Sequence, residues 1–181
     1  MNGRLAAFGL VWALAGCSAP AALQSFGGPT MGSSYSVVYA GGAPREAVVA
    51  AVADELAAFD LAFSQWRADS EIARVNAHAS KAPLPVGERF AAVLQLALRI
   101  AEATDGAFDP TVKPLRDLYR AARSDPRAPF DDAAIAAAVA RIGHRRIAVR
   151  DGAVVKARED VQVDLDGIVA GAACDAIAAR L

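Results

Sequence analysis

The stretch Gly106-Ala-Phe-Asp-Pro-Thr-Val-Lys-Pro-Leu115 organises the chain, because it separates two apolar helical patterns near the middle of the sequence. Pro110 removes a backbone donor and pushes Asp109 toward extended geometry, so this stretch cannot lie inside a helix. A rigid polar elbow between packed elements is a place where a ligand loop is expected. An ordinary helix-to-helix turn, with Gly106 just past the helix end, explains the same residues. Both interpretations stay open on these residues alone.

The composition indicates one folded domain without a strong charge preference. The chain has 181 residues, enough for a single domain with a real core. Hydrophobic residues make up 55% and charged residues 22%, which argues against wholesale disorder. The formal net charge is −1, and the scattered arginines form no basic stripe interleaved with aromatics. Nothing in the sequence therefore indicates a nucleic acid partner.

The N-terminus predicts an export signal over residues 1–16. Residues 5–14 form an apolar stretch that is too short for a permanent membrane span, and a basic residue precedes them. The following Leu14-Ala-Gly-Cys17 resembles the lipobox of bacterial lipoproteins, which implies that Cys17 is lipidated. A soluble secretory signal with an incidental cysteine is the alternative. Ser18 supplies no acidic retention signal, which favours the outer membrane over the inner one.

The cysteines and histidines are too few for a disulfide framework or a cluster of metal ligands. Lipidation of Cys17 leaves Cys174 as the remaining thiol, so no intrachain disulfide is expected. Cys174 lies in an alanine-rich helical pattern, and we interpret it as a small buried hydrophobe rather than a nucleophile. His78 and His144 are isolated from each other, which gives no Cys/His metal site.

The apolar patterns predict an α+β fold in which a mixed or antiparallel sheet packs with helices. A tether is expected over residues 17–30, and alternation predicts a strand over residues 34–40. A hairpin with the turn Asp151-Gly152 is predicted over residues 146–157, and Val161 and Val163 are expected to begin a further strand. Helical spacing predicts helices over residues 44–63, 71–76, 88–104, 115–119 and 131–143, and a last helix that runs to Leu181.

Trp66 stands out in a chain with only 7% aromatic residues. Polar residues flank it, and it precedes a short helix that the Ser70 side chain can cap. One interpretation is structural, because a tryptophan often seals the end of a helix.

Four motifs follow one another along the chain and resemble the ApbE family, the periplasmic FAD:protein FMN transferases, which are often lipoproteins. The resemblance covers residues 31–181, and it implies an ApbE-like (T-fold-like) transferase fold that is incomplete at the C-terminus. The motifs are Thr30-Met-Gly-Ser-Ser-Tyr35, Ser64-Gln-Trp-Arg-Ala-Asp-Ser-Glu71 with Asn76, Gly106 to Leu115, and Asp164-Leu-Asp-Gly-Ile-Val-Ala-Gly171 with Asp175.

The resemblance implies a Mg²⁺-dependent transferase that binds FAD, passes FMN to a threonine hydroxyl of an exported or membrane redox protein, and releases AMP. A diphosphate needs charge neutralisation by a metal and by backbone donors, and the acceptor hydroxyl needs a base within hydrogen-bond reach. The implied location is the periplasmic face of a bacterial membrane, with Cys17 as the lipid anchor. A non-catalytic FAD-binding lipoprotein and an inactive gene fragment are the alternatives.

The resemblance also implies roles for individual residues, although it assigns no catalytic residue within this chain. Trp66 would stack on a ring, and the backbone carbonyl of Gly167 would reach the metal. Thr111 would support the site by hydrogen bonding or would cap the loop. The implied cofactor-binding residues are Met31, Trp66, Ala107, Phe108, Asp109, Asp164 and Ala170.

Three positions depart from the family pattern. Ala170 stands where relatives commonly carry a lysine or another polar residue, Asp166 replaces a small residue, and Ala172 replaces an aromatic. The loss of a cation beside a diphosphate weakens binding by roughly 1.5–3 kcal/mol. Asp166 adds repulsion unless it faces solvent or metal. The family's remaining metal ligands and acceptor-side residues lie beyond the position of Leu181, so the chain resembles the N-terminal portion of a transferase.

Overall fold

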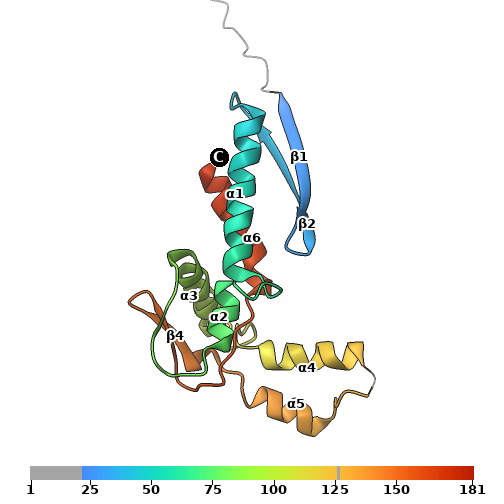
Figure 1. The fold of residues 1–181 in the computed structure, drawn as a ribbon, viewed down its shortest axis with the longest axis vertical. Coiled ribbons are helices and arrows are strands. Elements are labelled where there is room, and N and C mark those ends of the chain that lie inside the picture. The colour runs from blue at the N-terminus through green and yellow to red at the C-terminus, as the bar shows by residue number, and fades with distance from the viewer. Residues whose placement is uncertain (1–21, 126) are drawn as a thin grey trace, which may run out of the picture.

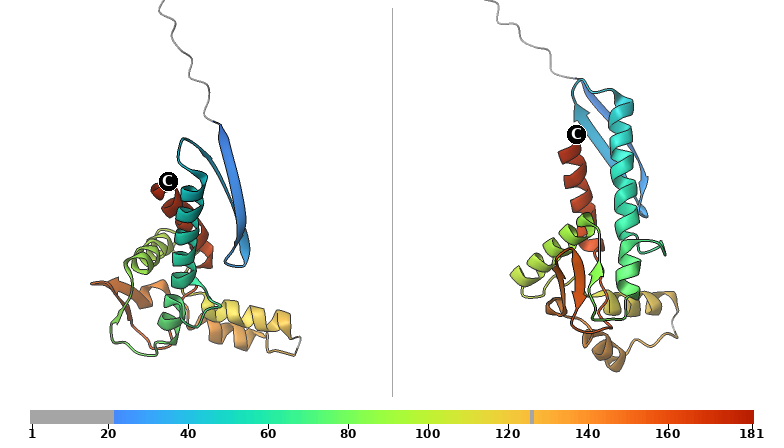
Figure 2. Two further views of the ribbon diagram at one scale, coloured as in Figure 1. Left: turned by 45° about the horizontal axis from the view of Figure 1, so that its top comes forward. Right: turned by 60° about the vertical axis from the view of Figure 1, so that its left-hand side comes forward.

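The computed structural model describes residues 22–125 and 127–181 of the chain. Cys17 and the predicted signal peptide over residues 1–16 lie outside these described residues. Two long helices, α1 (Arg45–Phe63) and α6 (Asp166–Arg180), lie side by side and form the axis of the molecule (Figure 1). A β-hairpin runs beside α1 (Figure 2). The smaller elements lie at the end of the helix pair where α1 ends and α6 begins.

The hairpin pairs β1 (Leu23–Thr30) with β2 (Ser33–Ala40) in antiparallel register, from Leu23 opposite Ala40 to Thr30 opposite Ser33. The strand predicted over residues 34–40 is confirmed. The tether predicted over residues 17–30 is wrong for residues 23–30, which are strand. The small residues that indicated a tether suit close pairing, because a Cβ on Gly27 would clash with the Tyr35 carbonyl oxygen.

Met31 and Gly32 make the two-residue turn between these strands. Both have positive φ angles, 43° and 75°, as in the turns whose twist matches that of paired strands. The Met31 side chain is half-buried and packs against the hydrophobic core. The turn therefore connects the hairpin to the body of the protein.

Two further helices begin and end close to the predicted residues. These are α2 (Glu71–Ala77) and α3 (Glu88–Ala103). The Ser70 side chain caps α2 as predicted, because its Oγ accepts a hydrogen bond from Ala73 N at 3.2 Å. The core lies where α1, α2, α3 and α6 meet the second sheet, and its largest members are Phe59, Phe63, Ile72, Phe90, Leu94 and Leu165.

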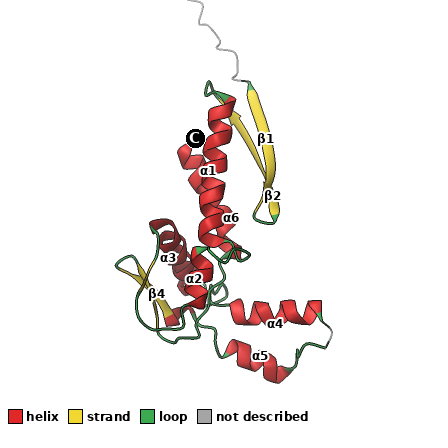
Figure 3. Cartoon of the chain, viewed as in Figure 1, coloured by secondary structure: helices red, strands yellow, loops and turns green. Residues whose placement is uncertain are grey.

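A small second sheet, in which Figure 3 labels β4, contains β3 (Leu84–Pro85), β4 (Ile147–Arg150) and β5 (Ala153–Lys156). Its strand order is β3, β5, β4, and both pairings are antiparallel. The predicted hairpin and its Asp151-Gly152 turn are confirmed, with φ angles of 49° and 72°. The α+β fold class is therefore confirmed, with helices and small antiparallel sheets.

The strand predicted to begin at Val161 is absent from the described structure, although residues 161–165 are largely buried. Neighbouring groups replace the missing strand. Asn76 pairs with both backbone groups of Val163, and Asp164 N donates to Pro110 O at 2.7 Å. Because these partners satisfy the buried backbone, no sheet is required there.

Helices α4 (Lys113–Ser124) and α5 (Asp132–Val139) pack against each other and project from the body (Figure 1). We call this pair the arm. The sequence predicted a shorter helix over residues 115–119, but Pro114 lies in the first turn of α4, where a missing N–H is tolerated. The helix predicted over residues 131–143 ends earlier, and a 3₁₀ turn, η1 (His144–Arg146), follows it.

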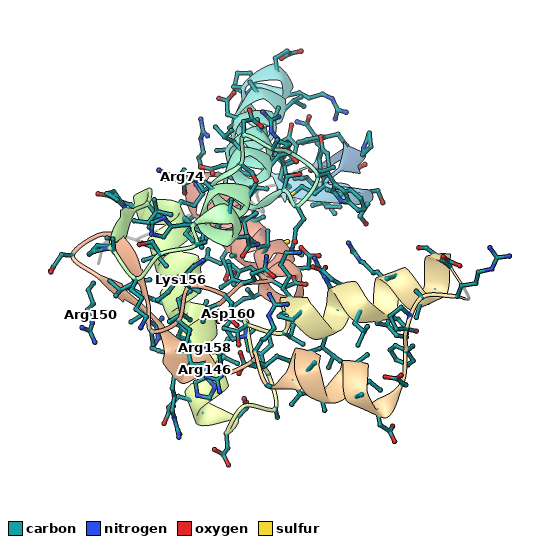
Figure 4. The ribbon with its side chains drawn as sticks, turned by 60° about the horizontal axis from the view of Figure 1, so that its bottom comes forward. Arg74, Arg146, Arg150, Lys156, Arg158 and Asp160 are labelled. Carbon is teal, nitrogen blue, oxygen red and sulfur yellow. The ribbon has the colours of Figure 1, made fainter. Side chains whose placement is uncertain are left out.

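Lys156 is a buried cation whose side chain is 1% exposed. Its Nζ donates to Val75 O at 2.7 Å and to His78 O at 2.8 Å, two carbonyls at the end of α2. Burial lowers the pKa of Lys156, and the nearby charge of Asp160 opposes that shift. Lys156 is therefore a structural cap of α2. The other basic side chains marked in Figure 4 come from several different elements, and they are Arg74, Arg146, Arg150 and Arg158.

Candidate functional site

Residues 106–112 form the loop between α3 and α4, which we call the 106–112 loop. Gly106 has a φ angle of 79° and closes the end of α3, because its N–H donates to Ala101 O at 2.8 Å. Phe108 N donates to Thr104 Oγ1 at 3.2 Å. The loop is thus fixed at its start by the helix that precedes it.

Asp109 holds the 106–112 loop in its conformation. Its Oδ1 accepts hydrogen bonds from Thr111 N at 2.8 Å and from Thr111 Oγ1 at 2.6 Å. Its Oδ2 accepts from His144 N at 2.9 Å and lies 3.2 Å from the Nδ1 ring nitrogen of His144. Both carboxylate oxygens of Asp109 therefore have partners within the protein.

Thr111 is fully buried and connects the same loop to η1. Its Oγ1 accepts a hydrogen bond from Gly143 N at 2.7 Å while it donates to Asp109. The loop-capping role for Thr111 is therefore the one that the geometry favours. The 106–112 loop is a turn between α3 and α4, and it also lines a hollow beside the start of α6. The interpretation as a helix-to-helix turn and the interpretation as a ligand loop are therefore compatible.

The first hollow has a volume of about 370 Å³ and lies between the 106–112 loop and the start of α6. Phe108 forms an apolar wall beside Gly167, where an added Cβ would lie 3.4 Å from the Phe108 ring. A helix N-terminus carries partial positive charge and suits an anion. The hollow is lined by Ala107, Phe108, Asp109, Val112, Arg116, Asp164, Asp166 and Gly167.

A charged cluster closes one side of the first hollow. The Arg116 guanidinium forms ion pairs with both Asp164 and Asp166, and its Nη2 donates to Gln65 Oε1 at 2.7 Å. Gln65 Nε2 in turn donates to Asp164 Oδ1 at 3.1 Å. Arg116 Nε is buried and has no hydrogen-bond partner among the described residues. Two carboxylates and one guanidinium leave this cluster with excess negative charge.

Asp164 is the most deeply buried acid of the cluster, with 6% of the residue exposed. Burial raises the pKa of Asp164, and the negative charge of Asp166 adds to the rise. A hydrogen bond from Asp166 N and the positive charges of Arg116 and Arg120 oppose it. Among the described residues, no group of three or more His, Cys, Asp or Glu side chains could hold a metal ion. The oxygen donors at hand are Asp164, Asp166 and backbone carbonyls such as that of Gly167.

A second hollow, of about 450 Å³, lies beside the first and shares Arg116 with it. Trp66 is 80% exposed at this hollow, so the interpretation of Trp66 as a helix seal is wrong. A tryptophan that seals a helix end would bury its ring, whereas this ring faces the arm. The second hollow is lined by Trp66, Arg116, Tyr119, Arg120, Arg123 and Ser124.

The structure brings together most, but not all, of the residues that the resemblance singled out. Met31 packs against the core, Ala170 is exposed on α6, and neither of them lines a hollow. Trp66 lines the second hollow. The residues that meet at the first hollow are Ala107, Phe108, Asp109, Asp164 and Gly167.

Sequence analysis missed Gln65, Arg116 and the arginines of α4. Positions 116, 120 and 123 share one face of a helix. A predicted helix that extended to residue 124 would have revealed this arginine face from the sequence. Gln65 lies within one of the four motifs, but nothing in its local pattern singled it out, because its partners Asp164 and Arg116 lie far away in the sequence. Cys174 is exposed in the structure, so its interpretation as a buried hydrophobe is wrong. The helical pattern placed it on α6 correctly but did not fix which face is covered.

Comparison of the fold with solved structures identifies the class of protein to which this chain belongs. The chain has the fold of flavin transferases: 88% of it superposes on the flavin transferase ApbE from Vibrio cholerae with a TM-score of 0.79 and 29% sequence identity. This superposition covers 53% of that structure. The sequence model described as "ApbE family" matches residues 31–181. The chain therefore belongs to the ApbE family.

Two curated relatives support this assignment at the level of sequence. The chain is 35% identical to an FAD:protein FMN transferase of Klebsiella pneumoniae over 189 residues, which cover 97% of this chain and 54% of that protein. It is 30% identical to an FAD:protein FMN transferase of Vibrio cholerae over 182 residues, which cover 98% of this chain and 54% of that protein. The chain thus spans about half the length of the curated relatives that it matches.

Proposed function

We propose that this chain provides the FAD-binding part of an FAD:protein FMN transferase, which moves FMN from FAD to a threonine hydroxyl of another protein and releases AMP. The observation that carries the proposal is the first hollow. There the aromatic wall of Phe108, the N-terminus of α6 and the Asp164 carboxylate face one space. A ring, a phosphate and a hydrogen-bonding nucleotide group are each matched by one of these features. The names of the relatives support the same conclusion.

Each of the chain's own groups has a task in this proposal. Phe108 excludes water from one side of the nucleotide, and the backbone N–H of Gly167 at the start of α6 binds a phosphate oxygen. Asp109 lines the same hollow and fixes the loop that carries Phe108. Asp164 hydrogen-bonds the nucleotide. Its position is maintained by Gln65, Arg116 and the N–H of Asp166.

Mg²⁺ is part of the proposal because the available donors are hard oxygens. Asp164, Asp166 and the carbonyl of Gly167 are the groups of this chain that would hold it. Mg²⁺ supplies neutralisation of the diphosphate charge. Asp166, which departs from the family pattern, is 53% exposed on its side chain and is therefore able to face an ion as well as Arg116.

The acceptor and the location are also proposals. We infer that the acceptor is an exported or membrane redox protein with a target threonine, at the periplasmic face of a bacterial membrane. Cys17 would anchor the chain through lipid, preferably in the outer membrane. No helix among residues 22–125 and 127–181 is both long and apolar enough to cross a membrane. Replacement of Cys17 by Ser is expected to move the protein from the membrane fraction to the soluble fraction.

The function is tested with the purified chain, FAD, Mg²⁺ and an acceptor protein that carries the target threonine. We expect FAD binding that Mg²⁺ strengthens, followed by AMP release and a fluorescent acceptor band in a denaturing gel. A variant acceptor with valine at the target threonine is the matched control. A chain that binds no FAD with or without Mg²⁺ would contradict the proposal.

Two alternatives have distinct results in the same experiment. Tight FAD binding that is insensitive to Mg²⁺ and gives no AMP favours a non-catalytic FAD-binding lipoprotein. An inactive gene fragment is favoured when the chain aggregates or when its unfolding in urea shows no cooperative transition.

A further inference from the structure

The arginines of α4 are the feature of the second hollow that the proposed function has not used. Arg116, Arg120 and Arg123 follow one another at helical spacing, and all three line this hollow. The Arg116 guanidinium already forms ion pairs with Asp164 and Asp166. Arg120 and Arg123 form no ion pair with a carboxylate in the part of the chain that the structure describes. The second hollow therefore presents two guanidinium groups that have no carboxylate partner at ion-pair distance among the described residues.

Each of these two arginines lies over an aromatic ring. The Arg120 guanidinium carbon is 5.5 Å from the centre of the Trp66 ring, and that of Arg123 is 5.8 Å from the centre of the Tyr119 ring. The Tyr119 ring also meets Phe130 edge-on, with ring centres 6.3 Å apart. Cation–π contacts orient a guanidinium but leave its N–H donors available. The hollow thus combines exposed aromatic surface with oriented, unpaired donors.

This combination selects the chemistry of a ligand. A neutral ring would use Trp66 but not the positive charges, and an inorganic anion would use the charges but not Trp66. A flat ring that carries a phosphate uses both, because the ring stacks on the aromatic surface while the phosphate accepts charge-assisted hydrogen bonds. An acidic peptide is the competing ligand, but it leaves the exposed aromatic surface of Trp66 uncovered.

We propose that Arg120 and Arg123 form an anion-binding wall that binds the phosphate-bearing end of a nucleotide whose ring stacks on Trp66. This inference rests on the proposed function, because it assigns that nucleotide to one end of FAD. Arg116 lines both hollows, so a ligand with two ring systems joined by a diphosphate can occupy both at once. Arg120 and Arg123 then set the preference for phosphorylated over neutral ligands.

The test compares charged and neutral ligands on the full chain. Isothermal titration measures the affinities for FAD and AMP and for their uncharged counterparts riboflavin and adenosine. In the double variant Arg120→Gln, Arg123→Gln we expect affinity for FAD and AMP to fall roughly tenfold or more, with riboflavin and adenosine unchanged. The matched control is Arg99→Gln, because Arg99 is an exposed arginine on α3 that lines neither hollow. Circular dichroism establishes that each variant remains folded.

The outcomes separate this inference from the proposed function. Unchanged FAD and AMP affinities in the double variant would overturn the arginine wall while the proposed function stands. An equal loss for charged and neutral ligands would also overturn it, because it would show a packing effect rather than recognition of phosphate. A chain that binds AMP but not FAD would contradict the proposed function and retain the wall. Binding of a polyglutamate peptide in place of AMP would assign the surface to an acidic protein partner instead.

Discussion

The side-chain amide of Asn76 pairs with both backbone groups of Val163. Its Nδ2 donates to Val163 O at 2.9 Å, and its Oδ1 accepts from Val163 N at 2.7 Å. These are the two bonds that a neighbouring strand would otherwise make. They join the end of α2 to a segment 87 residues later in the chain. Asp164 follows directly, so this pair of bonds positions the buried acid of the first hollow.

Replacement of Asn76 by Ala is expected to destabilise the protein by about 2–4 kcal/mol, because two buried backbone groups lose their partners. Urea unfolding measures this loss. Asn76→Asp keeps an acceptor for Val163 N but sets a charged carboxylate oxygen against the Val163 carbonyl oxygen, which repels it. We therefore expect it to be at least as destabilising as Asn76→Ala at neutral pH. Equal stability of Asn76→Ala and the unmodified protein would contradict this account.

Replacement of Lys156 by Ala is expected to cost about 3–5 kcal/mol in the free energy of unfolding. The change leaves two carbonyls at the end of α2 unpaired and opens a cavity in the core. Lys156→Met fills most of the same volume without a donor or a charge, so its cost should be smaller. A larger loss in the methionine variant than in the alanine variant would show that Lys156 does not act in this way.

Lys156 also predicts a pH dependence of stability. Burial lowers the pKa of Lys156 in the folded protein from 10.5, so the unfolded chain binds the proton more strongly. Its contribution to stability is therefore present above pH 10.5 and is lost as the pH falls through the lowered folded pKa. In urea titrations at alkaline pH, the rise of stability toward pH 10.5 should be flatter in Lys156→Met. A curve of unchanged slope in this variant would assign the rise to other groups.

Asp109→Asn tests whether the order of the 106–112 loop supports nucleotide binding. The amide group cannot accept hydrogen bonds on both sides, so the contacts to Thr111 or to His144 are lost. We expect a loss of about 1–3 kcal/mol in stability and weaker FAD binding. Asp151→Asn is the matched control, because asparagine tolerates the positive φ angle of 49° in that exposed turn. A fall in FAD affinity of the same size in both variants would show an effect unrelated to the loop.

Asp164 predicts an effect at acidic pH. Burial raises the pKa of Asp164 above 3.8, so the folded state binds this proton more strongly than the unfolded chain. The resulting contribution to stability is present below pH 3.8 and is lost as the pH rises through the folded pKa. Arg116→Met should raise the pKa of Asp164 further, because it removes an opposing positive charge. NMR titration of the Asp164 carboxyl carbon measures both shifts, and a pKa below 3.8 would refute the assignment.

The elements that sequence reasoning placed correctly are those with local causes. The Ser70 cap, the Asp151-Gly152 turn and the apolar stripes of α1 and α3 each depend on residues within a few positions of one another. Strand β1 was missed because its two glycines, its serine and its proline carry no strand signal of their own. Its pairing with β2 supplies the hydrogen bonds that the composition does not reveal.

The candidate functional residues also divide into those that lie in short local motifs and those whose contacts depend on distant parts of the chain. Phe108, Asp109, Asp164 and Gly167 lie in motifs that resemble those of a family, and the structure places all four at the first hollow. The four contacts that Asp109 makes with Thr111 and His144 became clear only from the tertiary structure. No residue pattern near Asp109 in the sequence predicts that His144 contacts its carboxylate.

The sequence by itself determined the α+β class, the family and the positions of most helices, because local propensity and short motifs are read from neighbouring residues. Tertiary structure alone decided the pairing of Asn76 with Val163, the burial of Lys156 and the ion pairs of Arg116 with Asp164 and Asp166. It also decided that Trp66 faces the arginines of α4 rather than the core. These contacts join residues far apart in the chain, and their free energy depends on burial that exists only after the chain has folded.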